Sequence, residues 1–298
     1  MKIYMAGVGG MLGEAFFKIF SEEGHELQCS DLNANETWLS SLDFRNYDAY
    51  RKQVIKFRPD YIFHIGAYTD LEFCELNPKD TYFTNTLSVE HAVCLANELE
   101  IPILYISTAG IFDGAKDLYD DWDSPNPLGV YARSKYMGER YVVENAMRYF
   151  ICRAGWMMGG GPEKDKKYIS KIMKQIKDGS KSLNIVNDRD GTPTYTIDFA
   201  RTCHGLVQTE FYGLYNMVCG GRTSRLEVTE EILSVVGLSE KIEINTVSSD
   251  FFKDEYFAAR PESERLVNKK LAMRNLDLMR DWKVCLKEYI DDRYSSYL

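Results

Sequence analysis

Long apolar runs, paired cysteines and an excess of positive charge are all missing from this sequence, and each absence excludes a class of protein. No apolar run approaches the roughly 18 residues that a membrane-spanning helix requires, so the chain is not expected to enter a membrane. The formal net charge of −9 argues against a general nucleic-acid binder, because phosphate backbones are recognised by clustered positive charge. With 45% hydrophobic and 27% charged residues, the composition is that of a soluble globular protein.

Disulfide and metal-binding patterns are absent as well. The seven cysteines stand singly, in an odd number and without a Cys-x-x-Cys pair, which predicts reduced thiols that are mostly buried. The four histidines have no metal-ligand spacing, so no metal site is predicted. The segment from Met1 to Gly7 resembles a first β-strand entering a glycine turn rather than a signal peptide, and we therefore expect a cytoplasmic location.

What the sequence does contain is an alternation of short β-rich runs with longer amphipathic stretches. This alternation is typical of βαβ units and predicts a parallel sheet. The predicted central strands are Lys2 to Ala6, Glu26 to Ser30, Tyr61 to Ile65, Ile103 to Ser107 and Tyr149 to Arg153. Leu183 to Val186 and Leu214 to Val218 are expected to return to the same sheet, and a further short β-rich piece covers Ile242 to Val247. The predicted helices include Glu14 to Glu23, Thr86 to Leu99 and Ser134 to Met147.

The pattern loosens after Arg153, which indicates a second lobe. Gly159-Gly160-Gly161-Pro162 interrupts the chain, and five lysines follow it between positions 164 and 174. We expect an α/β fold of the Rossmann type, in which a doubly wound parallel sheet carries a smaller, mainly helical C-terminal substrate lobe. Residues 1–155 with returning strands at about 183–220 would form the sheet domain, and residues 156–182 with 221–298 would form the substrate lobe.

A glycine-rich turn follows the first predicted strand. In the segment from Gly7 to Gly13, glycines at 7, 10 and 13 have the spacing Gly-x-x-Gly-x-x-Gly, which lets the backbone approach a pyrophosphate at a helix N-terminus. Its place between strand and helix predicts that the sheet domain binds a dinucleotide, although a mobile turn is the alternative. Asp31 ends the second strand, where its carboxylate would bind the ribose hydroxyls of NAD and repel the 2′-phosphate of NADP. The alternative role for Asp31 is a helix or turn cap.

Tyr131 and Lys135 are the only tyrosine and lysine in the chain with this order and a separation of four. An ammonium one helical turn away favours the phenolate, so the spacing is typical of a proton-donating tyrosine, although it also describes a solvated helix face. Thr108 ends the fourth strand, at the sheet edge where ligands bind, and its hydroxyl would hydrogen-bond a substrate carbonyl. The glycine turn, Asp31, Thr108 and the Tyr131–Lys135 pair thus have the order and spacing of one site for a cofactor and a ketone.

Further segments carry a resemblance to one known group. They are Arg58-Pro59-Asp60, Ala67-Tyr68-Thr69, Asn85, Ser107-Thr108, Phe112-Asp113-Gly114, Asn126 to Tyr131, Trp156, Asn187 to Thr194 and Arg260-Pro261. Together with the motifs above, they resemble the extended short-chain dehydrogenase/reductases and, within them, the dTDP-4-dehydrorhamnose reductase family, over nearly the full length. The last two segments are the most specific, because general dehydrogenases of the superfamily lack them.

The resemblance implies an oxidoreductase that delivers a nicotinamide hydride to the 4-keto group of a nucleotide-linked deoxysugar, in dTDP-rhamnose or surface-polysaccharide biosynthesis. It implies Thr108, Tyr131 and Lys135 as catalytic residues, with Lys135 lowering the pKa of Tyr131 and holding the nicotinamide ribose. The residues implied at the cofactor are Gly7, Gly10, Met11, Leu12, Gly13, Asp31, Asp43, Phe44, Ala67, Tyr68, Tyr131 and Lys135. Those implied at the substrate are Thr108, Tyr131, Trp156 and Arg260. Core packing is the alternative for Trp156 and a surface ion pair for Arg260.

The resemblance weakens around the sugar. Ala109-Gly110 follows Ser107-Thr108 where the family usually carries an acid and an aromatic residue. Ser263-Glu264 stands where the family usually has an Asn-Ser pair, and residues 159–167 depart from the usual substrate loop. Because the catalytic residues are intact while their surroundings differ, the sequence predicts the reaction class better than the sugar.

Two other functions fit the same motifs. An epimerase or another nucleotide-sugar reductase of the superfamily would use the same cofactor site. A non-catalytic cofactor-binding subunit, like the regulatory subunit of methionine adenosyltransferase, would bind the cofactor without turnover. NAD(H) is the favoured cofactor, with NADP(H) as the alternative. The expected partner is a nucleotide-sugar small molecule, not a nucleic acid or a membrane, and the sequence leaves a homodimer open.

Overall fold

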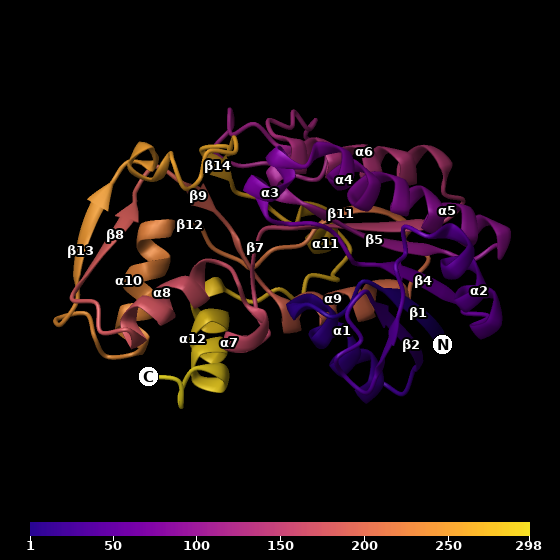
Figure 1. Ribbon diagram of the computed structural model, residues 1–298, viewed down its shortest axis with the longest axis horizontal. Helices are drawn as coiled ribbons and strands as arrows, with labels where there is room; N and C mark the ends of the chain where they lie inside the picture. The colour runs from indigo at the N-terminus through magenta and orange to yellow at the C-terminus, as the bar shows by residue number, and fades with distance from the viewer.

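Seven parallel strands form the central sheet of the computed structural model, which describes residues 1–298 (Figure 1). Their order across the sheet is β11-β6-β5-β4-β1-β2-β3. The strands are β1 (Lys2–Ala6), β2 (Glu26–Asp31), β3 (Leu39–Ser41), β4 (Tyr61–His64), β5 (Ile103–Thr108), β6 (Tyr149–Ala154) and β11 (Gly213–Asn216). The chain runs outward from β1 to β3 and then crosses to β4, which creates a switch point between β1 and β4, where ligands of such sheets bind. The predicted Rossmann-type sheet is confirmed.

Alternation along the strands supplies an apolar core on each face of the sheet. In β1, Ile3 and Met5 point into one core, while Tyr4 and Ala6 point into the other. Helices α1 (Met11–Glu22) and α9 (Thr196–Val207) cover the first face. Helices α2 (Tyr47–Phe57), α5 (Ser88–Glu98) and α6 (Val130–Asn145) cover the second, and Figure 1 shows the two layers below and above the sheet. The central strands are apolar throughout because both of their faces are buried.

A second lobe lies beside the sheet domain (Figure 1). It contains α7 (Gly161–Lys164), α8 (Tyr168–Lys177), β8 (Ser182–Val186), α10 (Arg225–Val235), β13 (Glu243–Val247), η3 (Ser249–Phe252) and α12 (Trp282–Arg293). One continuous apolar cluster includes Phe16 of α1, Ile172 of α8 and Tyr289 of α12. The lobe and the sheet domain therefore share part of one apolar core.

Two sets of very short strands lie between the lobe and the sheet (Figure 1). Strand β7 (Trp156–Met158) pairs with β10 (Pro193–Tyr195), and β9 (Asp190–Gly191) lies between β12 (Thr223–Ser224) and β14 (Ser263–Glu264). These pairings bring four distant parts of the chain to the carboxyl end of the main sheet.

One predicted strand pairing is wrong. Leu183 to Val186 was expected in the main sheet, but β8 pairs with β13 in a separate two-stranded sheet. The alternation of buried Leu183 and Ile185 with exposed Ser182 and Asn184 explains the outcome, because a central strand of this sheet would be buried on both faces. The return of Leu214 to Val218 is confirmed by β11, and the β-rich piece at Ile242 to Val247 is confirmed by β13.

The remaining elements connect the strands to the site. They are α3 (Leu71–Leu76), α4 (Pro78–Tyr82), the π-helix η1 (Phe83–Leu87), η2 (Ala109–Ile111) and α11 (Lys269–Met273). Helix α11 lies back against β11 of the main sheet. None of the helices combines the length and the apolar character that crossing a membrane would need.

Candidate active site

Gly7 and Gly13 bring helix α1 close to the end of β1. Gly7 has a φ of +76°, in the left-handed region that side chains disfavour, and a Cβ there would lie 2.2 Å from the Cα of Gly66. A Cβ on Gly13 would lie 2.0 Å from the carbonyl oxygen of Val8. Both positions therefore require glycine for the turn to have this shape.

Gly10 leaves the N-terminus of α1 open. It is the N-cap residue, no side chain caps the helix, and a Cβ at this position would meet no atom within 4 Å. The free N–H groups and the helix dipole favour an anion, so the geometry fits a dinucleotide pyrophosphate. Leu12 is buried in the core, whereas Met11 is half-buried and lies beside the loop at Gly160, where a Cβ would be 2.8 Å from its own.

Asp31 braces the glycine turn from the end of β2. One carboxylate oxygen accepts a hydrogen bond from the backbone N–H of Gly9 at 2.8 Å, and the other accepts one from Asn33 at 3.2 Å. The turn-capping alternative therefore describes Asp31 in this structure. Its carboxylate nevertheless lies beside the turn, and its contact with a cofactor ribose stays a prediction.

Asp43 and Phe44 support the cofactor side of the sheet. Hydrogen bonds from Arg45, at 2.9 and 2.7 Å, hold the pKa of the Asp43 carboxyl below its usual value. A Cβ on Gly66 would lie 2.5 Å from the ring of Phe44, so this ring packs under the turn that follows β4. Direct contact of either residue with a cofactor stays a prediction.

Asn85 links the loop after β4 to helix α6. Its Oδ1 accepts from the backbone N–H of Tyr68 at 2.8 Å, and its Nδ2 donates to the carbonyl oxygen of Tyr68 and to Ser134 Oγ, both at 3.0 Å. These bonds fix the loop of Ala67 and Tyr68 beside the helix that carries Tyr131. Asn85 lies in the π-helix η1, an element often found at functional sites. The sequence marked Asn85 as a match but gave it no role.

Thr108 and Tyr131 come together at the carboxyl end of the sheet. A Cβ built on Gly110 would lie 3.5 Å from Thr108 Oγ1 and 3.9 Å from Tyr131 Cε1. Burial raises the pKa of Tyr131 to about 12, although a hydrogen bond with Thr108 acts in the opposite direction. The phenol is therefore protonated at neutral pH and holds a proton that it can donate.

Lys135 shares a helix face with Tyr131 but is directed toward β5. Its Nζ donates to the carbonyl oxygen of Ile106 at 2.7 Å and lies 4.2 Å from the centroid of the Tyr105 ring. Burial lowers the pKa of Lys135 to about 7. Removing the phenol from water is the largest influence on the pKa of Tyr131, and the predicted lowering of this pKa by Lys135 stays a prediction.

Trp156 forms a wall of the site together with two residues that had no predicted role. Its indole N–H donates to Glu264 Oε2 at 2.6 Å, and the guanidinium of Arg225 lies 3.6 Å from its ring centroid. The indole packs so closely on Gly191 that a Cβ there would lie 2.2 Å from it. Trp156 is half-buried, so core packing alone does not describe it. Sequence spacing gave no signal for the bond to Glu264, because 108 positions separate the two residues.

Arg260 is held by an acidic residue of α3. Its guanidinium donates to Glu72 Oε2 at 2.9 Å and to the carbonyl oxygen of Ala258 at 2.9 Å. This is the ion-pair alternative, here joining the lobe to the sheet domain across partly buried side chains. A contact between Arg260 and a sugar nucleotide stays a prediction.

Four cations of the lobe form a basic cluster, which we define as Lys167, Lys171, Arg225 and Arg260. Burial lowers the pKa of Lys167, while Asp70 and Asp165 act in the opposite direction and Lys171 adds a smaller lowering effect. Burial likewise lowers the pKa of Arg225, while Glu264 acts in the opposite direction and Arg260 adds a smaller lowering effect. Arg225 forms no salt bridge, although the charge of Glu264 acts on it, and its guanidinium lies 3.6 and 4.4 Å from the ring centroids of Trp156 and Tyr168. An anion bound between these cations would relieve their repulsion.

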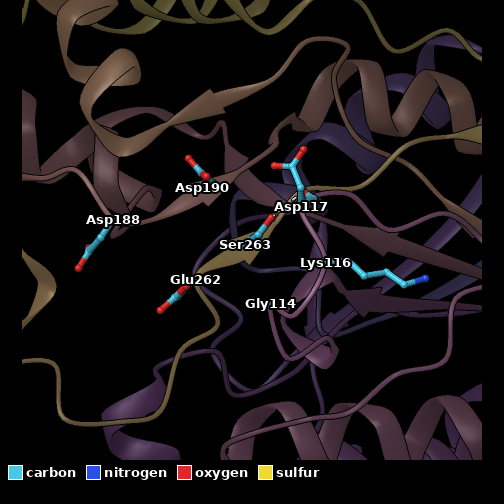
Figure 2. Close-up of a pocket in the computed structure, with 7 residues that line it drawn as sticks. All are labelled: Gly114, Lys116, Asp117, Asp188, Asp190, Glu262 and Ser263. Carbon is cyan, nitrogen blue, oxygen red and sulfur yellow. Dashed lines mark hydrogen bonds between the residues drawn. The ribbon is translucent and has the colours of Figure 1, made fainter.

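A hollow of about 330 Å³ at β9 and β14 has the opposite charge (Figure 2). Its lining includes Asp117, Asp188, Asp190 and Glu262, and no catalytic residue. Arg265 pairs with Asp117 and Asp190, and Arg222 pairs with Asp117, so part of this negative charge is compensated. No three His, Cys, Asp or Glu side chains are arranged to hold a metal ion.

The doubly wound sheet, the open glycine turn and the half-buried Tyr131 beside Thr108 define an oxidoreductase of the short-chain dehydrogenase/reductase type. The family model described as the RmlD substrate binding domain matches residues 1–295. The chain belongs to this family.

Relatives and solved structures agree with that assignment. The dTDP-4-dehydrorhamnose reductase of Salmonella typhimurium is 27% identical, with 99% of each chain covered. The methionine adenosyltransferase 2 subunit beta of Danio rerio is 27% identical over 70% of this chain and 64% of that protein. The crystal structure of a dTDP-4-dehydrorhamnose reductase from Clostridium acetobutylicum has a TM-score of 0.88 at 29% identity, covering 98% and 99% of the two chains. A Bacillus anthracis dTDP-4-dehydrorhamnose reductase in complex with NADP has a TM-score of 0.85 at 25% identity, with the same coverage.

Proposed function

We propose that the protein reduces the 4-keto group of a nucleotide-linked deoxysugar, dTDP-4-dehydrorhamnose or a close relative, with a nicotinamide dinucleotide as the reductant. The observation that carries this proposal is the convergence of Thr108 and Tyr131 at the carboxyl end of the sheet, in a chain that also has an open helix N-terminus at α1 and a basic cluster in the lobe. One anion site suits the cofactor pyrophosphate and the other suits the diphosphate of a sugar nucleotide.

The residues of the chain divide the reaction between them. The bound nicotinamide would supply the hydride for the carbonyl carbon. Thr108 donates a hydrogen bond that orients the carbonyl oxygen, and Tyr131 gives its proton to the same oxygen, so that hydride and proton together convert the ketone to an alcohol. Lys135 would turn from the Ile106 carbonyl toward the ribose of the nicotinamide and balance the phenolate that remains on Tyr131.

The residue at the end of β2, Asp31, indicates which nicotinamide cofactor the protein prefers. Asp31 places a carboxylate beside the glycine turn, and this charge would bind ribose hydroxyls and repel a 2′-phosphate. We therefore propose NADH, with NADPH as a slower substitute. The structure of the Bacillus anthracis relative is a complex with NADP, and initial rates with NADH and NADPH test the preference of this protein.

A substrate panel tests the proposal. Purified protein is incubated with dTDP-, UDP-, GDP- and CDP-linked 4-keto-deoxysugars and either NADH or NADPH, and loss of reduced cofactor is followed. We expect the dTDP-linked sugar to be reduced by the wild type and not by Tyr131→Phe. Efficient turnover of a differently linked sugar alone would correct the substrate, and the absence of turnover with all of them would overturn the proposal.

A non-catalytic role is the second candidate, favoured by the likeness to the methionine adenosyltransferase subunit of Danio rerio. Tight cofactor binding without turnover on any keto-sugar would support that role. The presence of both Tyr131 and Lys135 in a site with an oriented Thr108 favours the reductase.

A further inference from the structure

Glu264 projects a carboxylate toward the catalytic residues from the far side of the site. It lies on β14, which pairs with β9 so that Glu264 is in register with Gly191. The indole of Trp156 packs on Gly191 and takes up one carboxylate oxygen, Oε2, through its N–H. This bond fixes the orientation of the whole carboxylate, because both oxygens belong to one rigid plane.

The second oxygen, Oε1, accepts no hydrogen bond from the protein. It lies 3.1 Å from the point where a Cβ on Gly110 would be, and that point is 3.5 Å from Thr108 Oγ1 and 3.9 Å from Tyr131 Cε1. A carboxylate oxygen without a hydrogen bond therefore lies close to the same point as Thr108 and Tyr131, the residues proposed to hold the substrate carbonyl. The absence of a side chain on Gly110 is what leaves the space between them.

The charge around Glu264 favours a neutral hydrogen-bond donor. The guanidinium of Arg225 stacks on the Trp156 ring, and the negative charge of the Glu264 carboxylate acts on it. Arg225 therefore compensates part of the Glu264 charge, which weakens the attraction of the carboxylate for an ammonium group. A carboxylate accepts hydrogen bonds but cannot donate them, so a sugar hydroxyl is the complementary group and a sugar carboxylate is repelled.

We propose that Glu264 is the residue that selects the sugar, by accepting a hydrogen bond from a hydroxyl on the carbon next to the carbonyl. This inference rests on the proposed function. In a 6-deoxy-4-ketohexose, only one carbon next to the carbonyl carries a hydroxyl, the C3 position. The two departures from the family pattern, at Gly110 and at Glu264, meet at this one point in space.

The experiment measures discrimination at C3. Four proteins are compared, the wild type, Glu264→Gln, Gly110→Ala and the control Glu262→Gln, which removes an equal charge from an exposed residue two positions away. The probes are dTDP-4-dehydrorhamnose and its 3-deoxy and 3-amino analogues for reduction, and dTDP-rhamnose and its 3-deoxy analogue for binding. The readout is the ratio of kcat/KM, or of Kd, between the hydroxyl and deoxy compounds within each protein, because this ratio cancels any general loss of folding.

We expect the wild type and Glu262→Gln to favour the 3-hydroxyl compound about 10- to 100-fold, the range typical of a hydrogen bond to a charged group. Glu264→Gln should lower this ratio about tenfold and act mainly on KM. Gly110→Ala should lower it too, because its methyl group would press on Oε1 at 3.1 Å.

Each contrary result has a distinct meaning. An unchanged ratio in Glu264→Gln would overturn the role of Glu264 while leaving the proposed function standing. A wild-type preference for the 3-amino compound would overturn the assignment of a hydroxyl. Failure of the wild type to bind any of the dTDP-sugars would overturn the proposed function, and this inference with it.

Discussion

Arg153 and Glu139 form an ion pair in which both side chains are only 3% exposed, with Arg153 Nη2 2.5 Å from Glu139 Oε1. Arg153 lies on β6 and Glu139 lies on α6, one turn beyond Lys135. The pair therefore ties the helix that carries Tyr131 to the sheet that carries Thr108. Their relative placement depends on this buried contact, since the hydroxyls of Thr108 and Tyr131 must reach the same carbonyl oxygen.

Removing one partner of this pair should be costly. Glu139→Gln leaves the Arg153 charge buried and unpaired, and we expect unfolding free energy to fall by about 3 to 5 kcal/mol. Denaturant unfolding measures the change. The double variant Glu139→Gln with Arg153→Met should recover much of the loss, and a double variant as unstable as the sum of both single variants would show that the two residues do not interact.

Tyr131→Phe should remove the proton donor and leave the fold intact. We expect kcat to fall about a hundredfold or more, with cofactor affinity unchanged within about threefold. Steady-state kinetics and cofactor titration measure the two quantities. Tyr136→Phe is the matched control, because Tyr136 lies on the same helix and its hydroxyl makes no hydrogen bond. Near-normal turnover in Tyr131→Phe would exclude Tyr131 as the donor.

Lys135 should destabilise the protein in a pH-dependent way. Its folded pKa of about 7 lies below the usual lysine value, so the unfolded state binds more protons between pH 7 and about 10.5, and stability rises with pH across that window. Lys135→Met removes this cost and should raise the Tm at pH 6 by a few degrees, with the gain shrinking toward pH 10. Activity should be lost. The exposed substitution Lys52→Met should change neither, and a constant difference in Tm across pH would contradict the buried-charge account.

The carboxylate of Asp31 should set the cofactor preference. We expect kcat/KM with NADH to be at least equal to that with NADPH in the wild type. Asp31→Asn keeps an acceptor for the N–H of Gly9 and removes the charge, so it should improve NADPH use about tenfold relative to NADH. Asp48→Asn, on an exposed helix start, serves as control. A wild type that strongly prefers NADPH would mean that Asp31 only caps the turn.

A histidine pair at the other end of the sheet should weaken the protein in mild acid. The Nε2 atoms of His25 and His204 are 3.0 Å apart, so a positive charge on both rings at once is unfavourable. Burial, and repulsion from neighbouring positive groups including His204, lower the pKa of His25. The unfolded state then takes up the extra proton near pH 6.5, and stability falls as pH drops below that value. Tm measured from pH 7 to 5 should fall less in His25→Asn than in the wild type or in His91→Asn.

The fold was predictable where the residue pattern of one segment is compatible with only one degree of burial. The five central strands are apolar on both faces, and that pattern has few alternatives to a buried parallel sheet. The predicted pairing of residues 182–186 was wrong because a half-polar strand of five residues does not specify its partner. In this fold the strand pairs with β13. The strand β3, Leu39–Ser41, gave no signal, since three residues at the sheet edge carry too little pattern.

The site divides in the same way. Gly7, Thr108, Tyr131 and Lys135 could be predicted as site residues because each stands at a fixed offset from a strand end or from another residue. The roles of Asn85, Arg225 and Glu264 depend on partners far along the chain, and no spacing rule identifies them. The contact of Lys135 with Ile106 could not be predicted for a related reason: helical spacing fixes which face a lysine occupies, while the direction of its long side chain depends on the acceptors in the core, here the carbonyl of Ile106.

The apolar cluster that is continuous from α1 through α8 to α12 restricts which substitutions can alter the ligand preference of the site during evolution. Because the sheet domain and the lobe share this apolar cluster, a rotation of the lobe relative to the sheet would disrupt its packing. The site therefore has little freedom to adapt to a new ligand by such a motion. A new ligand preference therefore requires substitutions of side chains on the short strands between the sheet domain and the lobe. Single exchanges on β7, β9 or β14 are therefore the steps by which descendants of this chain would acquire a different sugar while retaining the same chemistry.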